Sequence, residues 1–327
     1  MSWLGNAKRT AYLCIILILV LVLIVSGLRI LESTVFYHEA EQRPTTSKTL
    51  VKDGVAYFPR QDITVVMVLG IDRFGVVDES NSYNNKGAAD MVSLLIFDER
   101  RETCAILCLN RDTMLEMPVL GIGGKQAGTA YQQLALSHTY GSGLNESCEN
   151  TRKTVSAFLT GIEIDYYVAM NMDAIGILND AVGGVKVIVE DDFSAIDPTI
   201  TKGELTLTGE QAINFVRTRK DISDQTNISR MDRQEQYMDG FIESVRKKQS
   251  ESVSFAVSAY EDVEDYIVTN CSATVISDMM NRYSEYEVLD VISPDGENVL
   301  GETYYEFHVD KEKLTDLVLD LFYAPKK

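Results

Sequence analysis

The sequence predicts an α/β domain that follows a single N-terminal transmembrane helix. Short apolar runs of strand length alternate with amphipathic runs of helical period over most of the chain, which is typical of layered α/β domains. A continuous apolar run at residues 11–28 precedes them and is long enough to cross a bilayer. No internal repeat or second linker interrupts the remainder, so we expect one large domain with its own core.

The charges next to the apolar run predict its orientation. Lys8 and Arg9 lie just before it, which favours a cytoplasmic tail at residues 1–10 and export of everything that follows. A cleaved signal peptide is the alternative. Because no small-x-small cleavage motif follows promptly, the sequence favours an uncleaved transmembrane signal anchor over residues 11–31.

Residues 32–61 contain Pro44 and alternating charges without a sustained apolar period, and we expect an extracytoplasmic tether there. The large domain then occupies residues 62–327, on the outer side of the cell membrane. The net charge of −19 argues against nucleic acid or an anionic membrane surface as the main partner. The sequence also lacks a GxSxG elbow, a phosphate-binding glycine loop and a zinc-like spacing of its three histidines.

Five cysteines leave the disulfide state open. Cys14 lies in the predicted membrane span, and the other four are Cys104, Cys108, Cys148 and Cys271. Four residues along a strand separate Cys104 from Cys108 by roughly 13 Å, too far for them to pair with each other. Other pairings and buried free thiols both remain possible.

The first strands of the domain bring three charged residues together. Residues 63–69 read as a buried strand that leads into Asp72, and the apolar runs 91–97 and 103–109 flank a charged turn, which predicts a hairpin. Folding the hairpin sets Asp90 opposite Arg111, and Asp72 joins them if its strand is a neighbour. Two carboxylates and a guanidinium suit a hard divalent cation beside a phosphate. The alternative is turn-capping aspartates with a surface arginine.

The loop between the two aspartates is polar and long enough to form a flexible flap. Further along, the alternation of period predicts helices near residues 129–140, 149–159, 173–181, 253–266, 273–283 and 311–321, and strands near 164–170, 185–189, 286–292 and 304–309. These elements are expected to form the scaffold.

A second charged cluster lies between residues 208 and 236, where four arginines stand close together in an acidic chain. Thr208 and Gln211 form a predicted capping box at the start of a short helix. An extended chain after Val216 would point Arg217 and Arg219 to the same face.

A second helix beginning near residues 227–229 would place Arg230 and Gln234 one turn apart on one side. Guanidinium groups from both elements would then converge on a phosphate or pyrophosphate with bidentate hydrogen bonds. The alternative is a solvated basic face with local salt bridges, to which Arg233 would also belong.

The motifs, taken in order, resemble a known family. They are LGID (69–72), AADMVSLLIFD (88–98), LNRDT (109–113), HTYGSG (138–143), DYYVAMNMDAIGILNDAVGGVKVIVEDDF (165–193), LTGEQAINFVRTRKD (207–221) and SRMDRQEQ (229–236). Behind a single N-terminal span, this set resembles the LytR-CpsA-Psr family of Gram-positive bacteria, over most of residues 62–247.

The resemblance implies an α-β-α sandwich with a central mixed sheet that encloses a polyprenyl chain. It implies a membrane-anchored phosphotransferase that moves a glycopolymer, such as teichoic acid or capsule, from an undecaprenyl-pyrophosphate carrier to a hydroxyl of peptidoglycan. A non-catalytic regulator that binds prenyl pyrophosphates, or a prenyl-pyrophosphate hydrolase, would use the same residues and remains an alternative.

The resemblance also implies roles for individual residues. Asp72 and Asp90 would hold Mg²⁺ or Mn²⁺, and Arg111 would contact the phosphates. The pyrophosphate would be bound by Arg111, Arg217, Arg219, Arg230 and Gln234, with Arg111, Asp90 and Arg219 as the catalytic residues. One departure is Ala88, where the family usually has an arginine; Lys86 is a candidate to replace it, although an ammonium lacks the fork of a guanidinium.

Overall fold

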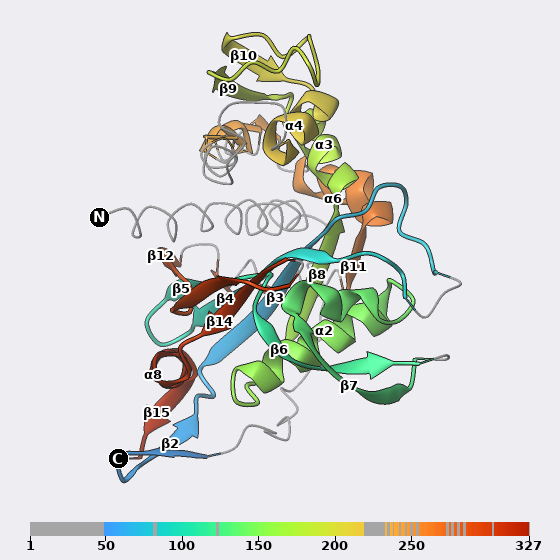
Figure 1. The fold of residues 1–327 in the computed structure, drawn as a ribbon. Helices are drawn as coiled ribbons and strands as arrows, with labels where there is room; N and C mark the ends of the chain where they lie inside the picture. The colour runs from blue at the N-terminus through green and yellow to red at the C-terminus, as the bar shows by residue number, and fades with distance from the viewer. Residues whose placement is uncertain are drawn as a thin grey trace.

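A six-stranded mixed sheet, in the order β11-β8-β3-β4-β5-β12, forms the centre of the computed structural model (Figure 1). Its strands are β3 (Ile63–Ile71), β4 (Ala89–Asp98), β5 (Thr103–Leu109), β8 (Tyr166–Asn171), β11 (Ile267–Thr269) and β12 (Glu287–Ile292). The structure describes residues 49–80, 84–121 and 124–218, then 233, 236–237, 239–241, 243–245, 247–248, 251–252, 255–272, 275, 278–279, 282–283, 286–302 and 304–326.

Strand direction decides which ends meet. The hairpin predicted from the apolar runs is confirmed: β4 pairs antiparallel with both β3 and β5. β8 runs parallel to β3, and β12 runs parallel to β5. The carboxyl ends of β3, β5 and β8 therefore lie at one edge of the sheet, together with the start of β4.

Alternation of side chains divides the core into two layers, one on each face of the sheet. Val66 and Val68 pack with the apolar sides of α3 (Met172–Ala181), α4 (Gly209–Arg217) and α6 (Phe255–Val263). Val65 and Met67 pack on the other face with α2 (Asn145–Phe158), the 3-10 helix η2 (Leu134–Thr139) and α8 (Lys311–Phe322). The result is a layered fold with helices on both faces of a mixed sheet. It confirms the layered α/β domain predicted from the alternating runs and the central mixed sheet implied by the family resemblance.

The predicted helix at residues 129–140 is wrong in its first part. β6 (Met114–Leu120) and β7 (Gln126–Gln133) form an antiparallel hairpin, and only the end of the predicted segment is helical, as η2. Most residues of β7 are exposed. A strand with little buried apolar surface shows no clear period in its sequence, and its pairing with β6 decides its conformation.

Most of the other predicted elements are present with shifted ends. The strand at β9 (Val185–Val189) is confirmed, but among the described strands it pairs with β10 (Gly203–Leu207) and not with the central sheet. The predicted helix of residues 253–266 is present as α6 followed by the 3-10 helix η3 (Glu264–Tyr266). A further hairpin, β13 (Gly296–Leu300) and β14 (Tyr305–Val309), precedes α8.

The folded domain begins earlier than predicted. β1 (Leu50–Lys52) and β2 (Val55–Pro59) form a sheet with the C-terminal strand β15 (Tyr323–Pro325), so these residues are not part of a tether that reaches residue 61. The predicted anchor and the tether up to residue 48 lie outside the described residues. Among the helices that the structure does describe, none has an apolar stretch long enough to cross a membrane.

The four cysteines of the domain are buried free thiols. Of the two possibilities left open by the sequence, the structure therefore supports thiols. Burial raises the pKa of Cys104 to about 12 and also raises that of Cys148, so both side chains stay protonated and pack as small apolar groups.

Candidate active site

The charged residues predicted from the first strands meet at the edge of the central sheet. Asp72 follows β3, and its backbone N–H donates to the carbonyl of Ala88 across the β3 and β4 pair at 3.1 Å. Gly70 pairs with Met91 and Ile71 pairs with Ala89, so Asp90 is the extra residue of a β-bulge. Bulges of this kind change the direction of a side chain and are common next to active sites.

Arg111 lies where the hairpin geometry predicted it, opposite Asp90. Its Nη1 is 2.5 Å from Asp90 Oδ1, and its Nε is 3.5 Å from Asp112 Oδ1. The Nε atom is buried and makes no hydrogen bond within the described part of the chain. A buried guanidinium nitrogen without an acceptor is unfavourable, and an oxygen of a bound phosphate would satisfy it.

Asp112 stands next to Arg111 and is fixed by a hydrogen bond from strand β7. Its Oδ1 accepts a hydrogen bond from Gln133 Nε2 at 2.9 Å, and its pKa is raised by burial and lowered less by Arg111. It therefore serves the framework around Arg111.

The first arginine of the second cluster reaches the same edge. The predicted capping box between Thr208 and Gln211 is confirmed and starts α4, whose buried residues include Ala212, Phe215 and Val216. Arg217 is the last residue of this helix, one residue later than predicted, and Thr218 is the first extended residue.

Arg217 Nη2 lies 3.5 Å from Asp72 Oδ1, and its guanidinium lies 5.1 Å from the centre of the Phe74 ring. Its side chain is 52% exposed, so it is accessible to a ligand from solvent. The two clusters, which are separated by more than a hundred residues, therefore meet through Asp72 and Arg217. The other predicted pyrophosphate ligands, Arg219, Arg230 and Gln234, lie outside the described residues.

Arg233 belongs to the framework. It is 6% exposed, its Nε donates to the carbonyl of Phe215 at 3.0 Å, and its Nη2 donates to the carbonyl of Thr218. Its Nη1 pairs with Asp191 at 2.6 Å, and the guanidinium lies over the ring of Phe193. This arginine satisfies backbone carbonyls at the end of α4 and fixes the helix that carries Arg217. The reading of a solvated basic face is wrong for it.

The two predicted metal ligands fit Mg²⁺ in their chemistry. No group of three acidic, histidine or cysteine side chains with metal-binding geometry occurs among the described residues. Mg²⁺ is usually held by one or two carboxylates together with water and substrate phosphates, so Asp72 and Asp90 would suffice once a phosphate is bound. Each now pairs with an arginine that a pyrophosphate would also attract.

The flap before β4 is fastened at its C-terminal end. The Asn85 side chain is buried, and its Nδ2 donates to the carbonyl of His138 at 2.8 Å and lies 2.9 Å from Ser147 Oγ. Ala88 is half-buried, and Lys86 is exposed without an ion pair to any described residue. The sequence did not predict these hydrogen bonds of Asn85, because their acceptors lie more than fifty residues further along the chain.

Comparison with known proteins gives one family. The model of the LytR_cpsA_psr family matches residues 26–321. The chain is 24% identical over 278 residues to the polyisoprenyl-teichoic acid–peptidoglycan teichoic acid transferase TagU of Bacillus licheniformis, covering 84% of this chain and 82% of that protein. It is 24% identical over 277 residues to TagU of Bacillus subtilis, with the same coverage of both proteins.

Solved structures share the fold. TagT bound to LI-WTA superposes with a TM-score of 0.55 at 23% identity, over 87% of this chain and 98% of that one. TagV of B. subtilis gives a TM-score of 0.55 at 24% identity, over 80% of this chain and 96% of that one. The match of the family model to nearly the whole described domain shows that this chain belongs to the LytR-CpsA-Psr family.

Proposed function

We propose that this chain is a membrane-anchored phosphotransferase that moves a glycopolymer from an undecaprenyl-pyrophosphate carrier to a hydroxyl of peptidoglycan. Family membership and the transferase names of its relatives support this activity. The observation that carries it is the sheet edge at which Asp72, Asp90, Arg111 and Arg217 meet, where Arg111 Nε is buried without a hydrogen-bond acceptor among the described residues.

The arginines would act on the charge of the pyrophosphate. In the transfer step, the oxygen of the acceptor hydroxyl attacks the phosphorus that bears the glycopolymer, and its proton passes to a base. The bond from this phosphorus to the bridging oxygen breaks, and the prenyl monophosphate leaves. Guanidinium groups placed beforehand at the two phosphates stabilise the negative charge that grows on the leaving group.

The family motif extends the binding set to Arg219, Arg230 and Gln234, which follow Arg217 in the chain. Asp72 and Asp90 would hold Mg²⁺ or Mn²⁺, which would supply further positive charge beside the phosphates. When the pyrophosphate and the metal bind, both aspartates would exchange their arginine partners for the cation.

The position of Arg217 suggests where the lipid lies. Arg217 ends α4, and the rest of that helix packs into the apolar layer between the sheet and α3 and α6. A prenyl chain attached to a phosphate beside Arg217 would extend along this layer, where burial of its methylenes stabilises binding.

Lys8 and Arg9 before the apolar run of residues 11–28 support a cytoplasmic N-terminus and an extracytoplasmic domain.

Product analysis tests the proposal. The purified full-length protein is incubated with a lipid-linked donor and peptidoglycan, and the products are followed by mass spectrometry. Transfer predicts prenyl monophosphate together with glycopolymer joined to peptidoglycan through a phosphodiester. Prenyl monophosphate with free glycopolymer phosphate would instead indicate a hydrolase, and donor binding without turnover would indicate a regulator.

A further inference from the structure

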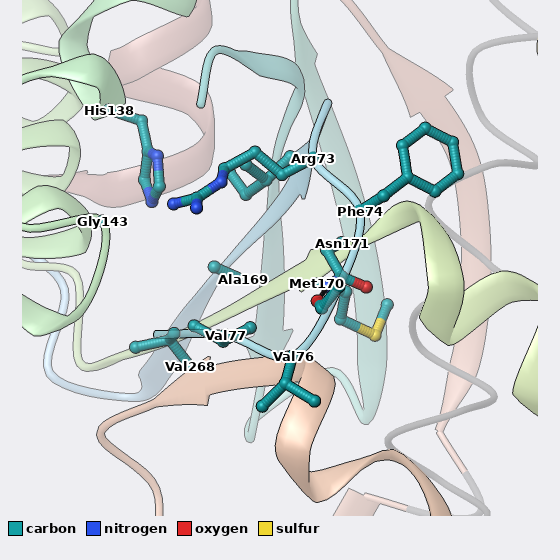
Figure 2. Close-up of a pocket in the computed structure, with 12 residues that line it drawn as sticks. Arg73, Phe74, Val76, Val77, His138, Gly143, Ala169, Met170, Asn171 and Val268 are labelled. Carbon is teal, nitrogen blue, oxygen red and sulfur yellow. Dashed lines mark hydrogen bonds between the residues drawn. The ribbon is translucent and has the colours of Figure 1, made fainter. Parts of the chain in front are cut away.

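A recess lies beside the candidate active site, at the same edge of the sheet (Figure 2). Its walls come from the end of β3 and the following loop, the end of β8, β11, and the segment around η2. They are mostly apolar and include Ile71, Arg73, Val77, His138, Gly143 and Asn171. The space inside accepts little more than one water-sized group, so the recess can receive a small charged terminus and not a sugar ring.

The side chains of the adjacent residues Asp72 and Arg73 point in different directions. Asp72 pairs with Arg217, which belongs to the helical layer of α3, α4 and α6. Arg73 points the other way, toward His138 and Gly143, which belong to η2 and the loop before α2 (Figure 2). Phe74 turns back and lies over Arg217. Arg73 is therefore not one of the predicted pyrophosphate ligands.

The Arg73 side chain is held by two glycines. A Cβ atom on Gly87 would lie 2.8 Å from Arg73 Cδ, and one on Gly143 would lie 3.0 Å from Arg73 Nη1. Gly143 also has a φ of 86°, which favours glycine. The buried Asn85 amide fixes the flap against the loop of Gly143. An arginine packed in this way loses little further freedom when it binds a ligand.

Few groups near Arg73 would compete with a bound anion for its guanidinium. Its one ion pair within the described residues is with Asp78, at 3.5 Å, and that carboxylate is 75% exposed. Asn171 is occupied, because its Nδ2 donates to Gly75 and its Oδ1 accepts from Ala174. His138 is buried with Nδ1 2.8 Å from the carbonyl of Gly87, and burial lowers its pKa to about 4, so it is neutral. Arg73 is thus the cation of the recess.

We propose that this recess binds a carboxylate of the acceptor, with the Arg73 guanidinium as its partner and one carboxylate oxygen in the water-sized space. The proposal rests on the proposed function. The sheet edge would separate two anionic ligands, with the pyrophosphate of the donor beside Arg217 and the acceptor carboxylate beside Arg73. A phosphodiester within the glycopolymer is flanked by large groups on both sides and does not fit the small recess.

Kinetics with matched acceptors test this assignment. A soluble glycan-peptide acceptor with free carboxylates is compared with the same acceptor converted to carboxamides, for the wild type and for Arg73→Gln. Loss of a charge-assisted hydrogen bond predicts that Arg73→Gln raises the KM for the carboxylate acceptor by about tenfold or more. The KM for the donor and the turnover of the amidated acceptor should stay unchanged. Arg101→Gln, an exposed arginine on the turn after β4, is the control and should change neither.

Three results would overturn the proposal. They are an equal loss with both acceptors, a rise in the KM for the donor alone, and a wild type that does not distinguish the two acceptors. Calorimetric titration of the full-length protein with the same two acceptors, without donor, measures binding even if no transfer occurs. Preference of the wild type for the carboxylate form, lost in Arg73→Gln, would support the recess when the proposed transferase function fails, and no preference would refute it.

Discussion

Arg217 and Arg233 stand sixteen residues apart in the same basic segment, and the structure predicts opposite consequences for their removal. The Arg233 side chain is 7% exposed and joins Asp191 to the carbonyls at the end of α4. The Arg217 side chain is 52% exposed. Its one ion pair within the described residues is with Asp72, at 3.5 Å between Nη2 and Oδ1. We expect Arg233→Ala to reduce stability and Arg217→Ala to reduce activity.

The magnitudes follow from burial. Removing one partner of a buried ion pair costs roughly 3–5 kcal/mol, because the remaining charge is left without a partner. Asp191 retains 18% exposure, so we expect the lower end, about 3 kcal/mol, for Arg233→Ala. An exposed ion pair contributes under about 1 kcal/mol, so Arg217→Ala should leave the free energy of unfolding nearly unchanged.

Both quantities are measured on the full-length protein in detergent. Urea unfolding followed by circular dichroism gives the free energy of unfolding, and transfer is measured at a temperature at which each variant is folded. Arg217→Lys keeps the charge and loses the bidentate fork, so it should lose much of the activity that Arg217→Ala loses. Arg233→Ala within about 0.5 kcal/mol of the wild type would refute the structural role, since surface substitutions usually fall in this range. A similar loss of stability in Arg217→Ala would refute the assignment of that residue to a ligand site.

Four further predictions concern the metal, the lipid, pH and topology. Asp90→Ala should abolish transfer with the fold intact in circular dichroism, and full activity of this variant in excess chelator would contradict the metal assignment. Shortening the prenyl chain of the donor should weaken binding, measured by titration, by about 0.8 kcal/mol for each buried methylene lost; equal use of a donor without a tail would rule out an apolar lipid site. Burial lowers the pKa of His138 to about 4 from an ordinary value of 6.5. The contribution of this neutral histidine to the free energy of unfolding is therefore fully present above pH 6.5 and is lost as pH falls toward 4. The free energy of unfolding should fall by about 3 kcal/mol across this window, and His138→Asn, which does not titrate, should flatten the change; an unchanged slope would show that other groups cause it. Protease added to intact protoplasts should degrade the large domain, and protection of the domain would reverse the predicted topology.

Sequence reasoning succeeded where local pattern decides the structure. Continuous apolar runs identified β3, β4 and β5, and counting outward from the charged turn was enough to place Asp90 opposite Arg111. The capping box at Thr208 and Gln211 fixed the start of α4 because both hydrogen bonds lie within four residues. These signals depend on neighbours in the chain.

Prediction from the sequence failed where residues distant in the chain decide the structure. β7 is mostly exposed and takes its conformation from pairing with β6, so its sequence shows no apolar alternation. Arg233 looked like part of a basic cluster, because its partner Asp191 lies 42 residues earlier. The recess of Arg73 depends on Gly87, Gly143 and Asn85 from separate segments, and no spacing in the sequence joins them.

We expect the sheet edge formed by Asp72, Asp90, Arg111 and Arg217 to bind the pyrophosphate of a prenyl-linked donor. A structure of the full-length protein, purified in mild detergent and incubated with undecaprenyl pyrophosphate and Mg²⁺, tests this claim most directly. Phosphate oxygens within hydrogen-bond distance of Arg111 Nε and the Arg217 guanidinium, with the cation on Asp72 and Asp90, would agree with it. A pyrophosphate bound elsewhere, with the Asp90 to Arg111 and Asp72 to Arg217 pairs unchanged, would contradict it.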